Sequence, residues 1–379
     1  MRKILYISGT RADYGLMRRA LSSIRSYPGL SIEIAATGMH LMPGFGRTIN
    51  DIRKDKFKVN CIQAAYDGTD RESMARFIGK FTLLFTKAAK HIKPDIILVL
   101  GDRAEMLAAA MVGVYLGIPV AHIHGGDVSS TVDEISRHAI TKLAHIHLAA
   151  TPASAARIAK MGEDRWRIYT VGAPGLDGIL SQIAYSRREI AAIYGLDLSL
   201  PLVLVAQHPV SAELKDASRQ MEQTLRAVAR LKAQAILVYP NADAGANSMI
   251  RVIENYRRIP RIKIYKNIPR PQFISLMNIS SAILGNSSSA IIEAPEFGLR
   301  AVNIGSRQDG RERAENIIDC GYDSGEIFRS AQKIMRLNKA QKKRRFNSPY
   351  HRGSAGTKIA RILKNKKIDQ QLLQKRIAY

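Results

Sequence analysis

The sequence predicts an α/β protein made of two Rossmann-like, doubly wound domains that face a cleft. Short apolar runs rich in β-branched residues alternate with segments of helical periodicity, and this alternation occurs twice. A small-residue segment, Gly-Ala-Pro-Gly at 172–175, separates the two series. The length of 379 residues suits two or three domains. With 46% hydrophobic and 24% charged residues, the composition excludes a disordered chain, a collagen-like repeat and a small disulfide scaffold.

The first series is expected to form the parallel sheet of the N-terminal domain. Its strands are expected at residues 3–7, 31–36, 96–100, 120–123, 147–149 and 168–171. Their uninterrupted apolar character is typical of parallel strands buried on both faces. The longest apolar segment, 106–116, is interrupted by Gly113. It predicts a core helix, because a membrane span needs about 18 apolar residues or more.

The second series is expected to form the sheet of the C-terminal domain. A helix at 187–194 leads into it, and its strands are expected at residues 202–206, 235–239, 262–265, 282–284 and 301–304. We therefore expect an N-terminal domain at 1–178, a C-terminal domain at 179–364 and a basic tail at 365–379. The last helices of the second domain are candidates for packing back on the first.

The unusual feature of the composition is a formal net charge of +26. Such a charge predicts attraction to an anion, which could be nucleic acid, a membrane surface or a phosphorylated small molecule. Residues 327–379 hold 16 Lys and Arg against one acid, Asp369, so more than half of the charge lies there. We expect a solvated helical tail. Membrane or nucleic-acid docking is the alternative, although no helix-turn-helix or zinc-finger spacing is present.

The cysteines and the N-terminus predict a cytoplasmic protein. The chain has only Cys61 and Cys320, which make no disulfide framework and suit a reducing compartment. The apolar run that follows the first basic residues is too short for a signal peptide and has no small-residue cleavage site, so it predicts a first strand instead.

Ligands of doubly wound sheets bind outside the carboxyl ends of the strands, so the residues at those ends are the candidates. Arg11 lies in a small-residue turn after the first strand, which suits a diphosphate or an ordinary βα turn. The turn lacks GxGxxG, which argues against a dinucleotide. Asp102 follows the strand at 96–100 and is either a helix N-cap or a catalytic carboxylate.

His124 follows the strand at 120–123, and His122 is expected on the same face. We expect no metal there, because a third and a fourth ligand are missing at recognisable spacing. Asp133 lies in a loop that carries two acids, an Arg and a His within six residues. This loop predicts either a solvated helix start or a catalytic segment.

In the second half, His208 stands at a strand end before a Pro, where it suits an acid, a base or a phosphate contact. Ser287 and Ser288 follow an apolar strand and open a helix, an arrangement that favours phosphate binding. Glu293, about a turn later, is a candidate for the hydroxyls of a ribose.

Taken together, these segments resemble the hydrolysing UDP-N-acetylglucosamine 2-epimerases, in the sialic-acid and legionaminic-acid pathway branch. The resemblance spans residues 3 to 363. It rests on the segments GTRADY (9–14), GDR (101–103), TVD (131–133), RHAITK (137–142), QHPV (207–210), PNADAG (240–245), GNSS (285–288) and NIGSRQxGR (303–311).

The resemblance implies a GT-B-like pair of domains, a homodimer or homotetramer, and no nicotinamide or metal cofactor. The implied reaction converts UDP-N-acetylglucosamine to N-acetylmannosamine and UDP through a 2-acetamidoglucal, for nonulosonic acid synthesis. The implied catalytic residues are Asp102, Asp133 and His208, with His124 nearby. The residues implied to bind the UDP-sugar are Arg11, Ser287, Ser288, Glu293, Asn241, Arg307 and Arg311.

Two departures from the family pattern bear on the sugar. The family often has Glu where this chain has His124, and the loop reads Asp-Glu-Ile-Ser at 133–136 where the branch commonly has Asp-Asp-Ser-Ile. The alternative substrate is UDP-2,4-diacetamido-2,4,6-trideoxyglucose, used in the legionaminic acid pathway. A GT-B glycosyltransferase and a basic nucleic-acid-binding protein are the rival classes. We expect no nucleic-acid partner, and membrane contact through the tail stays a minor alternative.

Overall fold

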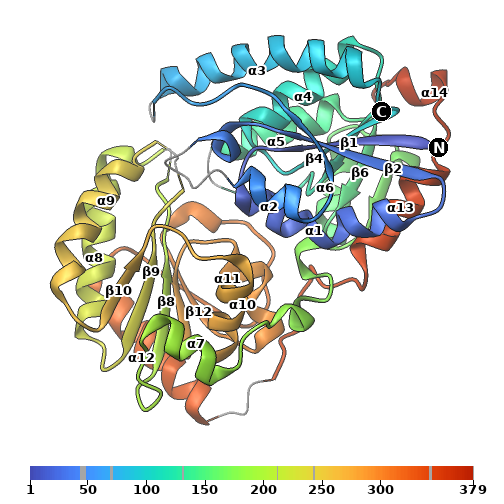
Figure 1. Cartoon of the computed structure of the whole chain (residues 1–379). Helices are drawn as coiled ribbons and strands as arrows, with labels where there is room; N and C mark the ends of the chain where they lie inside the picture. Colours follow the sequence, from blue (N-terminus) through green and yellow to red (C-terminus); the bar gives the residue numbers. More distant parts are fainter. Residues whose placement is uncertain are drawn as a thin grey trace. The chain divides into compact units, whose positions relative to one another are not determined.

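A computed structural model describes residues 1–42, 48–68, 71–129, 132–210, 212–241, 244–340 and 344–378 (Figure 1). The chain forms two compact units. The first comprises the described residues within Met1–Val128, Val132–Asp177 and Tyr350–Tyr379, and the second those within Ser129–Thr131 and Gly178–Pro349. Each unit has its own parallel sheet with helices on both faces, so the α/β class with two doubly wound sheets is confirmed.

The first unit has a seven-stranded parallel sheet in the order β3-β2-β1-β4-β5-β6-β7. Its strands are β1 (Arg2–Ser8), β2 (Leu30–Ala36), β3 (Lys58–Cys61), β4 (Ile96–Leu100), β5 (Val120–Ile123), β6 (Ile146–Ala149) and β7 (Ile168–Thr170). Its α-helices are α1 (Arg11–Ser26), α2 (Ile49–Lys54), α3 (Arg71–Ile92), α4 (Ala104–Tyr115), α5 (Val132–Leu143), α6 (Pro152–Lys160), α13 (Ala355–Asn365) and α14 (Gln370–Leu373). Short 3-10 turns lie at Gly38–Leu41, Arg165–Arg167 and Pro174–Leu176.

Both faces of this sheet are covered, which explains why its central strands are apolar throughout. On one face, Ile4 and Leu98 pack with side chains of α1 and α13 such as Met17 and Ile359. The other face is covered by α3, α4 and α5. On α3, the ring of Phe81 stacks with the phenylalanine rings on either side of it along the helix. All five residues of β4 are buried.

The second unit has a six-stranded parallel sheet in the order β10-β9-β8-β11-β12-β13. Its strands are β8 (Leu202–Ala206), β9 (Gln234–Val238), β10 (Ile262–Tyr265), β11 (Ala282–Gly285), β12 (Ala301–Ile304) and β13 (Ile317–Cys320). Its α-helices are α7 (Arg187–Tyr194), α8 (Ala217–Arg230), α9 (Ala246–Asn255), α10 (Arg270–Ile279), α11 (Ser289–Ile292) and α12 (Ser324–Ala340). Short 3-10 turns lie at Ile179–Gln182, Leu214–Asp216, Tyr256–Arg258, Ala294–Phe297 and Ser306–Gln308.

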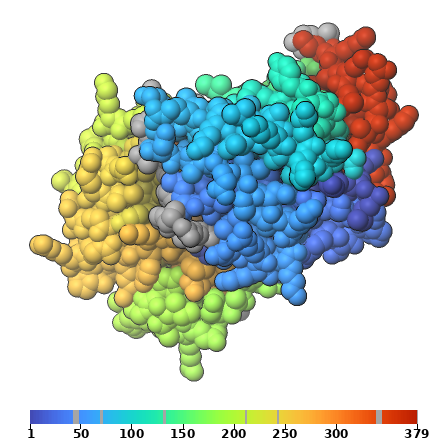
Figure 2. Space-filling view, turned by 45° about the horizontal axis from the view of Figure 1, so that its top comes forward, coloured from blue at the N-terminus to red at the C-terminus, as the bar shows by residue number. Residues whose placement is uncertain are grey.

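The C-terminal segment, residues 350–378, packs on the first unit and differs from the expected solvated helical tail. Figure 2 shows this red segment against the blue and green surface of the same unit. Leu372 is fully buried, and Arg167 donates to the carbonyls of Gln371 and Leu372 at 2.7 Å each. Lys375 pairs with Glu163 at 2.7 Å and donates to carbonyls at the end of α5. Among the described residues beyond Asn365, Gln370–Leu373 forms a short helix, and its Leu372 joins the core of the first unit.

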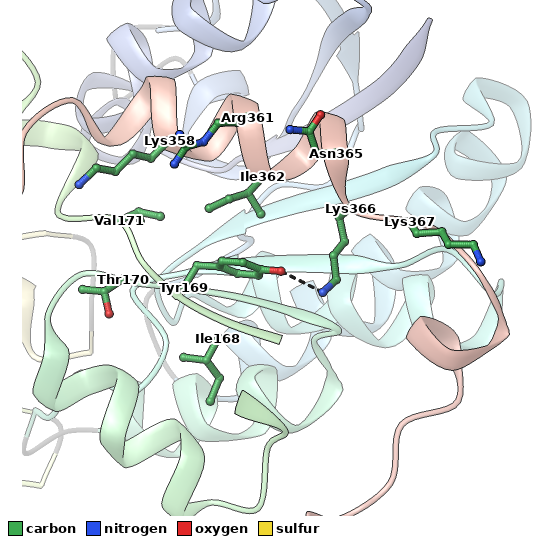
Figure 3. A pocket seen from close by; sticks show the side chains of 10 residues that line it. All are labelled: Ile168, Tyr169, Thr170, Val171, Lys358, Arg361, Ile362, Asn365, Lys366 and Lys367. Atoms are coloured by element: carbon green, nitrogen blue, oxygen red, sulfur yellow. Dashed lines mark hydrogen bonds between the residues drawn. The ribbon is translucent and has the colours of Figure 1, made fainter. Parts of the chain in front are cut away.

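A cavity of about 580 Å³ lies in the first unit beside the edge strand β7 (Figure 3). Its lining includes Lys358 and Arg361 of α13, and Lys366 donates to the Tyr169 hydroxyl at 2.9 Å. None of the predicted site residues lines it. Within the described part of the chain, no helix is both long and apolar enough to cross a membrane.

Candidate functional site

The strands β1, β4 and β5 are neighbours in the first sheet, so the turns at their carboxyl ends share one edge. After β1, Thr10 caps α1 in a reciprocal capping box with Asp13. The Asp13 carboxylate accepts from the Gly9 and Thr10 amides at 3.0 and 2.6 Å. Burial raises the pKa of Asp13 to about 6. Arg11 begins α1, and its Nε lies 3.6 Å from the Asp51 carboxylate.

Gly9, in the turn after β1, lies close to the Glu105 side chain, which lies in the first turn of α4. A Cβ on Gly9 would lie 1.8 Å from Oε1 of Glu105, so a larger residue there would force the Glu105 side chain to move. Glu105 is fully buried and pairs with Arg103 at 2.7 Å. The backbone around Arg11 is therefore held by buried contacts on both sides.

Asp102 follows β4 and forms an ion pair with Arg137 of α5. The Arg137 side chain is 3% exposed, whereas that of Asp102 is 24% exposed. The alternative role as an N-cap does not apply, because Arg103 occupies the cap position of α4. Burial by itself would lower the pKa of Arg137, but Asp102, Asp127 and Asp133 more than offset this, and its pKa is raised.

The residues after β5 form a tight turn in which His124 and Asp127 meet. His124 has a left-handed backbone with φ of 62°, and its Nδ1 lies 3.0 Å from Oδ2 of Asp127. Asp127 also accepts from the Ser154 hydroxyl at 2.7 Å. His122 is separate, because its Nε2 contacts the Gly101 carbonyl at 2.7 Å. Burial lowers the pKa of His122 to about 3, so this ring is a neutral core group.

Asp133 lies in the first turn of α5, half-buried and one helical turn before Arg137. The first unit thus brings Asp102, His124 and Asp133 into one charged group around Arg137 and Asp127. Thr131 of the TVD segment lies outside the described residues. Within the described ranges, no group of three His, Cys, Asp or Glu side chains could hold a metal ion.

In the second unit, β8 and β11 are neighbours, and His208 follows β8. The Asn286 side chain clamps its backbone, accepting from the His208 amide at 2.7 Å and donating to its carbonyl at 2.9 Å. The backbone N–H of Asn241 donates to Nδ1 of His208 at 3.1 Å. Burial, with a smaller contribution from Arg307, lowers the pKa of His208 to about 3. The ring is therefore neutral, and its proton lies on Nε2.

The GNSS segment forms the turn after β11. Gly285 has φ of 125°, and a Cβ there would lie 2.1 Å from the Ala206 carbonyl oxygen. The helix that follows, α11, spans only Ser289–Ile292, and Ser288 is its N-cap residue. Ser287 donates to the Ser289 hydroxyl at 3.3 Å, and Ser288 is half-buried at the start of α11.

The four remaining predicted residues of the second unit are Arg307, Arg311, Glu293 and Asn241. Arg307 donates to the Asn286 carbonyl at 3.2 Å, which places its guanidinium beside the GNSS backbone. Arg311 follows the 3-10 turn Ser306–Gln308 and is half-buried. Glu293 is 3% exposed and lies 2.7 Å from Arg270 of α10, so its carboxylate already has a cationic partner. Asn241 is exposed, and residues 242 and 243 of its segment lie outside the described residues.

Sequence reasoning did not select Asp127, Arg137 or Asn286 as site residues. Each had a local signal: Asp127 follows two glycines at a strand end, and Arg137 lies four residues after Asp133 on the same helix. Asn286 lies inside the GNSS segment itself. What the sequence lacks is the partner of each side chain, which comes from another element.

Comparisons with known proteins bear on the family and the fold of the chain. A family model described as UDP-N-acetylglucosamine 2-epimerase matches residues 22–364. A Legionella pneumophila protein named UDP-N,N'-diacetylbacillosamine 2-epimerase (hydrolyzing) is 40% identical over 380 residues, covering 100% of both chains. A Neisseria meningitidis UDP-N-acetylglucosamine 2-epimerase is 32% identical over 376 residues, covering 99% of this chain and 98% of the relative.

A solved structure supports the fold. The UDP-GlcNAc 2-epimerase from Neisseria meningitidis bound to UDP-GlcNAc superposes with a TM-score of 0.81 at 16% identity. It covers 96% of this chain and 100% of its own. At that identity the likeness shows a shared GT-B-like architecture, and the assignment of a substrate needs other support.

Proposed function

Because the chain belongs to the UDP-N-acetylglucosamine 2-epimerase family, we propose that it acts on UDP-2,4-diacetamido-2,4,6-trideoxyglucose. The chain is a hydrolysing nucleotide-sugar 2-epimerase, and the proposal concerns its sugar. The observation that supports this substrate is the 40% identity over the whole chain to a relative named for UDP-N,N'-diacetylbacillosamine, which is the same compound. The relative named for UDP-N-acetylglucosamine is 32% identical. This reverses the preference for UDP-N-acetylglucosamine drawn from the motifs.

The chemistry of the sugar determines the order of steps. The C2 proton is barely acidic, so a carboxylate cannot remove it directly at a useful rate. Loss of UDP builds oxocarbenium character at C1, and C2–H then becomes acidic enough for a positioned base. Elimination gives a 2-acetamidoglycal. Water then adds, its hydroxyl to C1 and a proton to the other face of C2, which gives the manno sugar and leaves UDP as the second product.

We assign the proton transfers to the charged group of the first unit. Asp102 and Asp133 are the candidates for the base at C2 and for activating water, and His124 is the third proton-transfer group. The Asp102–Arg137 ion pair keeps the carboxylate ionised beside a buried cation, which suits a base.

We assign the leaving diphosphate to donors at the carboxyl edge of the second sheet. These are Ser287, Ser288, Arg307 and the neutral His208, which offers an Nε2–H donor because its Nδ1 accepts from the backbone amide of Asn241. Arg11 stays a candidate from the resemblance alone. Stabilising the negative charge that develops on UDP lowers the barrier to the first step.

Three residues remain from the set that the resemblance implies for binding the UDP-sugar. The backbone amide of Asn241 contacts His208, and we propose that Asn241 contacts the nucleotide. Arg311 is proposed for the same role from the resemblance alone. Glu293 can bind a ribose only in competition with Arg270, its present partner at 2.7 Å. An oligomer, expected from the resemblance, also stays a proposal, which light scattering of the purified protein tests.

The deciding experiment compares the two UDP-sugars in matched assays of UDP release. We expect a kcat/KM at least tenfold higher for the 2,4-diacetamido sugar than for UDP-N-acetylglucosamine. A preference for UDP-N-acetylglucosamine would overturn the substrate but not the reaction. Turnover in D₂O is expected to place deuterium at C2 of the product, and retention of the original hydrogen there would refute the elimination route.

A further inference from the structure

We propose that Asp127 is a positioning residue that holds the His124 imidazole in one tautomer, with its proton on Nδ1 and its lone pair on Nε2. In this arrangement Nε2 of His124 exchanges a proton with the sugar or the attacking water during turnover. The inference rests on the proposed function, because it gives His124 a defined chemical role in that reaction.

The contacts of Asp127 favour an ionised carboxylate that accepts from the ring. Its side chain is 1% exposed, and Oδ2 lies 3.0 Å from Nδ1 of His124. The other oxygen accepts from the Ser154 hydroxyl at 2.7 Å. An ionised carboxylate is an acceptor only, so Nδ1 must carry the proton. Nε2 is then the acceptor nitrogen, and within the described ranges no residue makes a hydrogen bond to it.

The backbone of the turn is shaped for this contact. His124 has φ of 62°, a left-handed conformation that is uncommon for a side-chain-bearing residue and is often found at functional sites. Gly126 has φ of 75°, and a Cβ there would lie 2.3 Å from the Ser154 carbonyl oxygen. A Cβ on Gly125 would lie 2.9 Å from Nδ1 of His122. The two glycines therefore let the chain reverse tightly, so that Asp127 returns to the ring of His124.

The ring is held on a second side as well. The imidazole of His124 stacks on the Tyr350 ring with centroids 6.4 Å apart and an interplanar angle of 24°. The His124 side chain is 15% exposed, so the ring is covered but not sealed from a ligand. The imidazole of His124 rotates about only two side-chain bonds. The contacts with Asp127 and Tyr350 therefore leave the ring little freedom to flip.

The surrounding charges keep the Asp127 carboxylate ionised. Arg137 of α5 donates to the Asp127 carbonyl at 3.1 Å, and Arg157 of α6 donates to the Gly126 carbonyl. Asp102 and Asp133 also interact electrostatically with Arg137, so they share its positive charge with Asp127. Two guanidinium groups thus lie against the turn, which stabilises a negative charge on Asp127.

This geometry gives a balanced proton cycle. Nε2 accepts one proton, and the imidazolium that forms is stabilised by the adjacent Asp127 carboxylate. The imidazolium then loses that proton to solvent water before the turnover ends, so the enzyme ends unchanged and the hydrogen at C2 of the product comes from water. With the other tautomer, Nε2 would already carry a proton and could not act as the base.

A double-mutant cycle tests whether Asp127 works through His124. We expect His124→Gln and Asp127→Asn each to lower kcat by about 10²–10⁴-fold with KM changed by less than about threefold. The double variant should be no slower than His124→Gln alone, because the second change then removes nothing further. Ser154→Ala removes only the bond to the other oxygen of Asp127, so its loss should stay below about tenfold. Multiplying losses in the double variant would overturn the proposal.

The tautomer itself is read by ¹⁵N NMR of protein with labelled histidines. The His124 signals are assigned by their disappearance in His124→Gln. We expect a protonated Nδ1 in the wild type and a protonated Nε2 in Asp127→Asn, whose amide can donate to Nδ1. Finding Nε2 protonated in the wild type would refute the proposal.

Controls separate a structural effect from a positioning effect. Thermal melting of each variant checks folding, and Asp127→Glu replaces Asp127→Asn in the cycle if the latter does not fold. If the wild type releases UDP from neither sugar, the proposed function fails, while the NMR result still decides the tautomer. If the wild type is active and the cycle is additive, only this inference fails.

Discussion

The carboxyl edges of the two sheets have the same topology but opposite chemistry. At the first edge, carboxylates such as Asp102 and Asp127 meet a buried guanidinium and an imidazole. At the second edge, the groups around the GNSS turn are mainly donors: serine hydroxyls, Arg307 and a neutral His208. Parallel strands therefore supply positions, and the residues placed there decide which charges and hydrogen-bonding groups each edge presents.

The largest effect is expected from removing a carboxylate at the first edge. Asp102→Asn should lower kcat by about 10³-fold, because it removes a charge needed for proton transfer. UDP affinity should change by less than about threefold if the nucleotide is held mainly at the second edge. Stopped assays of UDP release measure the first quantity, and calorimetric titration with UDP measures the second.

The same strand offers a matched control. Asp95 immediately precedes β4, at the opposite end from Asp102, and accepts from the Lys3 amide at 2.7 Å. Asp95→Asn should leave kcat unchanged. Thermal melting of both variants is needed, because Asp102→Asn leaves Arg137 buried without this partner. Equal losses of kcat and UDP affinity in Asp102→Asn would contradict the proposal that the first edge carries proton transfer and the second edge holds the nucleotide.

A second effect compares the glycines that end a strand in each unit. Gly285→Ala should destabilise the second unit by about 3 kcal/mol or more, since its Cβ would lie 2.1 Å from a backbone oxygen at a φ of 125°. Gly101→Ala, with φ of 75° and nothing within 4 Å of the added Cβ, should cost about 1–2 kcal/mol. Urea unfolding of both variants tests the ranking, and equal costs would show that the crowding at Gly285 relaxes.

The buried strands of both sheets could be predicted closely from the sequence. The ranges 96–100, 120–123, 202–206, 262–265 and 301–304 coincide with β4, β5, β8, β10 and β12, and the helix 187–194 with α7. The strands β3 (Lys58–Cys61) and β13 (Ile317–Cys320) were missed. Both lie at a sheet edge, and β3 has no buried residue, so neither produces a continuous apolar run.

The sequence predicted which residues lie at the strand ends but not the side chains with which they pair. Strand ends indicated Asp102, His124 and His208, because topology alone brings such ends to one edge. The Arg137 partner of Asp102 depends on how α5 packs, and the Arg270 partner of Glu293 depends on α10. Such pairings are set by tertiary packing, on which local sequence carries little information.

A third effect is a steeper loss of stability in acid for the first unit. In the first unit, burial lowers the pKa of His40 and of His145 to about 4 and the pKa of His122 to about 3. In the second unit, burial lowers the pKa of His208 to about 3. Unfolded imidazoles protonate near pH 6.5, so each contribution is complete above that pH and is lost below it. The loss is about 1.4 kcal/mol per pH unit for each ring.

Asp13 opposes part of this loss in the first unit. Its raised pKa of about 6 lets the folded form bind a proton before the unfolded form does, which offsets about one ring between pH 6 and pH 4. The first unit should still lose stability at least twice as steeply as the second. Hydrogen exchange, read peptide by peptide between pH 7.5 and pH 5 and corrected for intrinsic rates, measures both. Earlier opening of the second unit would contradict these assignments.

The smallest effect is expected from one hydroxyl at the second edge. Ser287→Ala should weaken UDP binding about 3- to 10-fold, the range of a single hydrogen bond, and leave kcat nearly unchanged. This is the reverse of the pattern for Asp102→Asn. Ser22→Ala, which removes an exposed hydroxyl that donates only to the Arg18 carbonyl on α1, serves as the control with no change in either quantity. If Ser287→Ala instead lowered kcat at unchanged UDP affinity, the serine would act on the transition state, and the second edge would share in the chemistry.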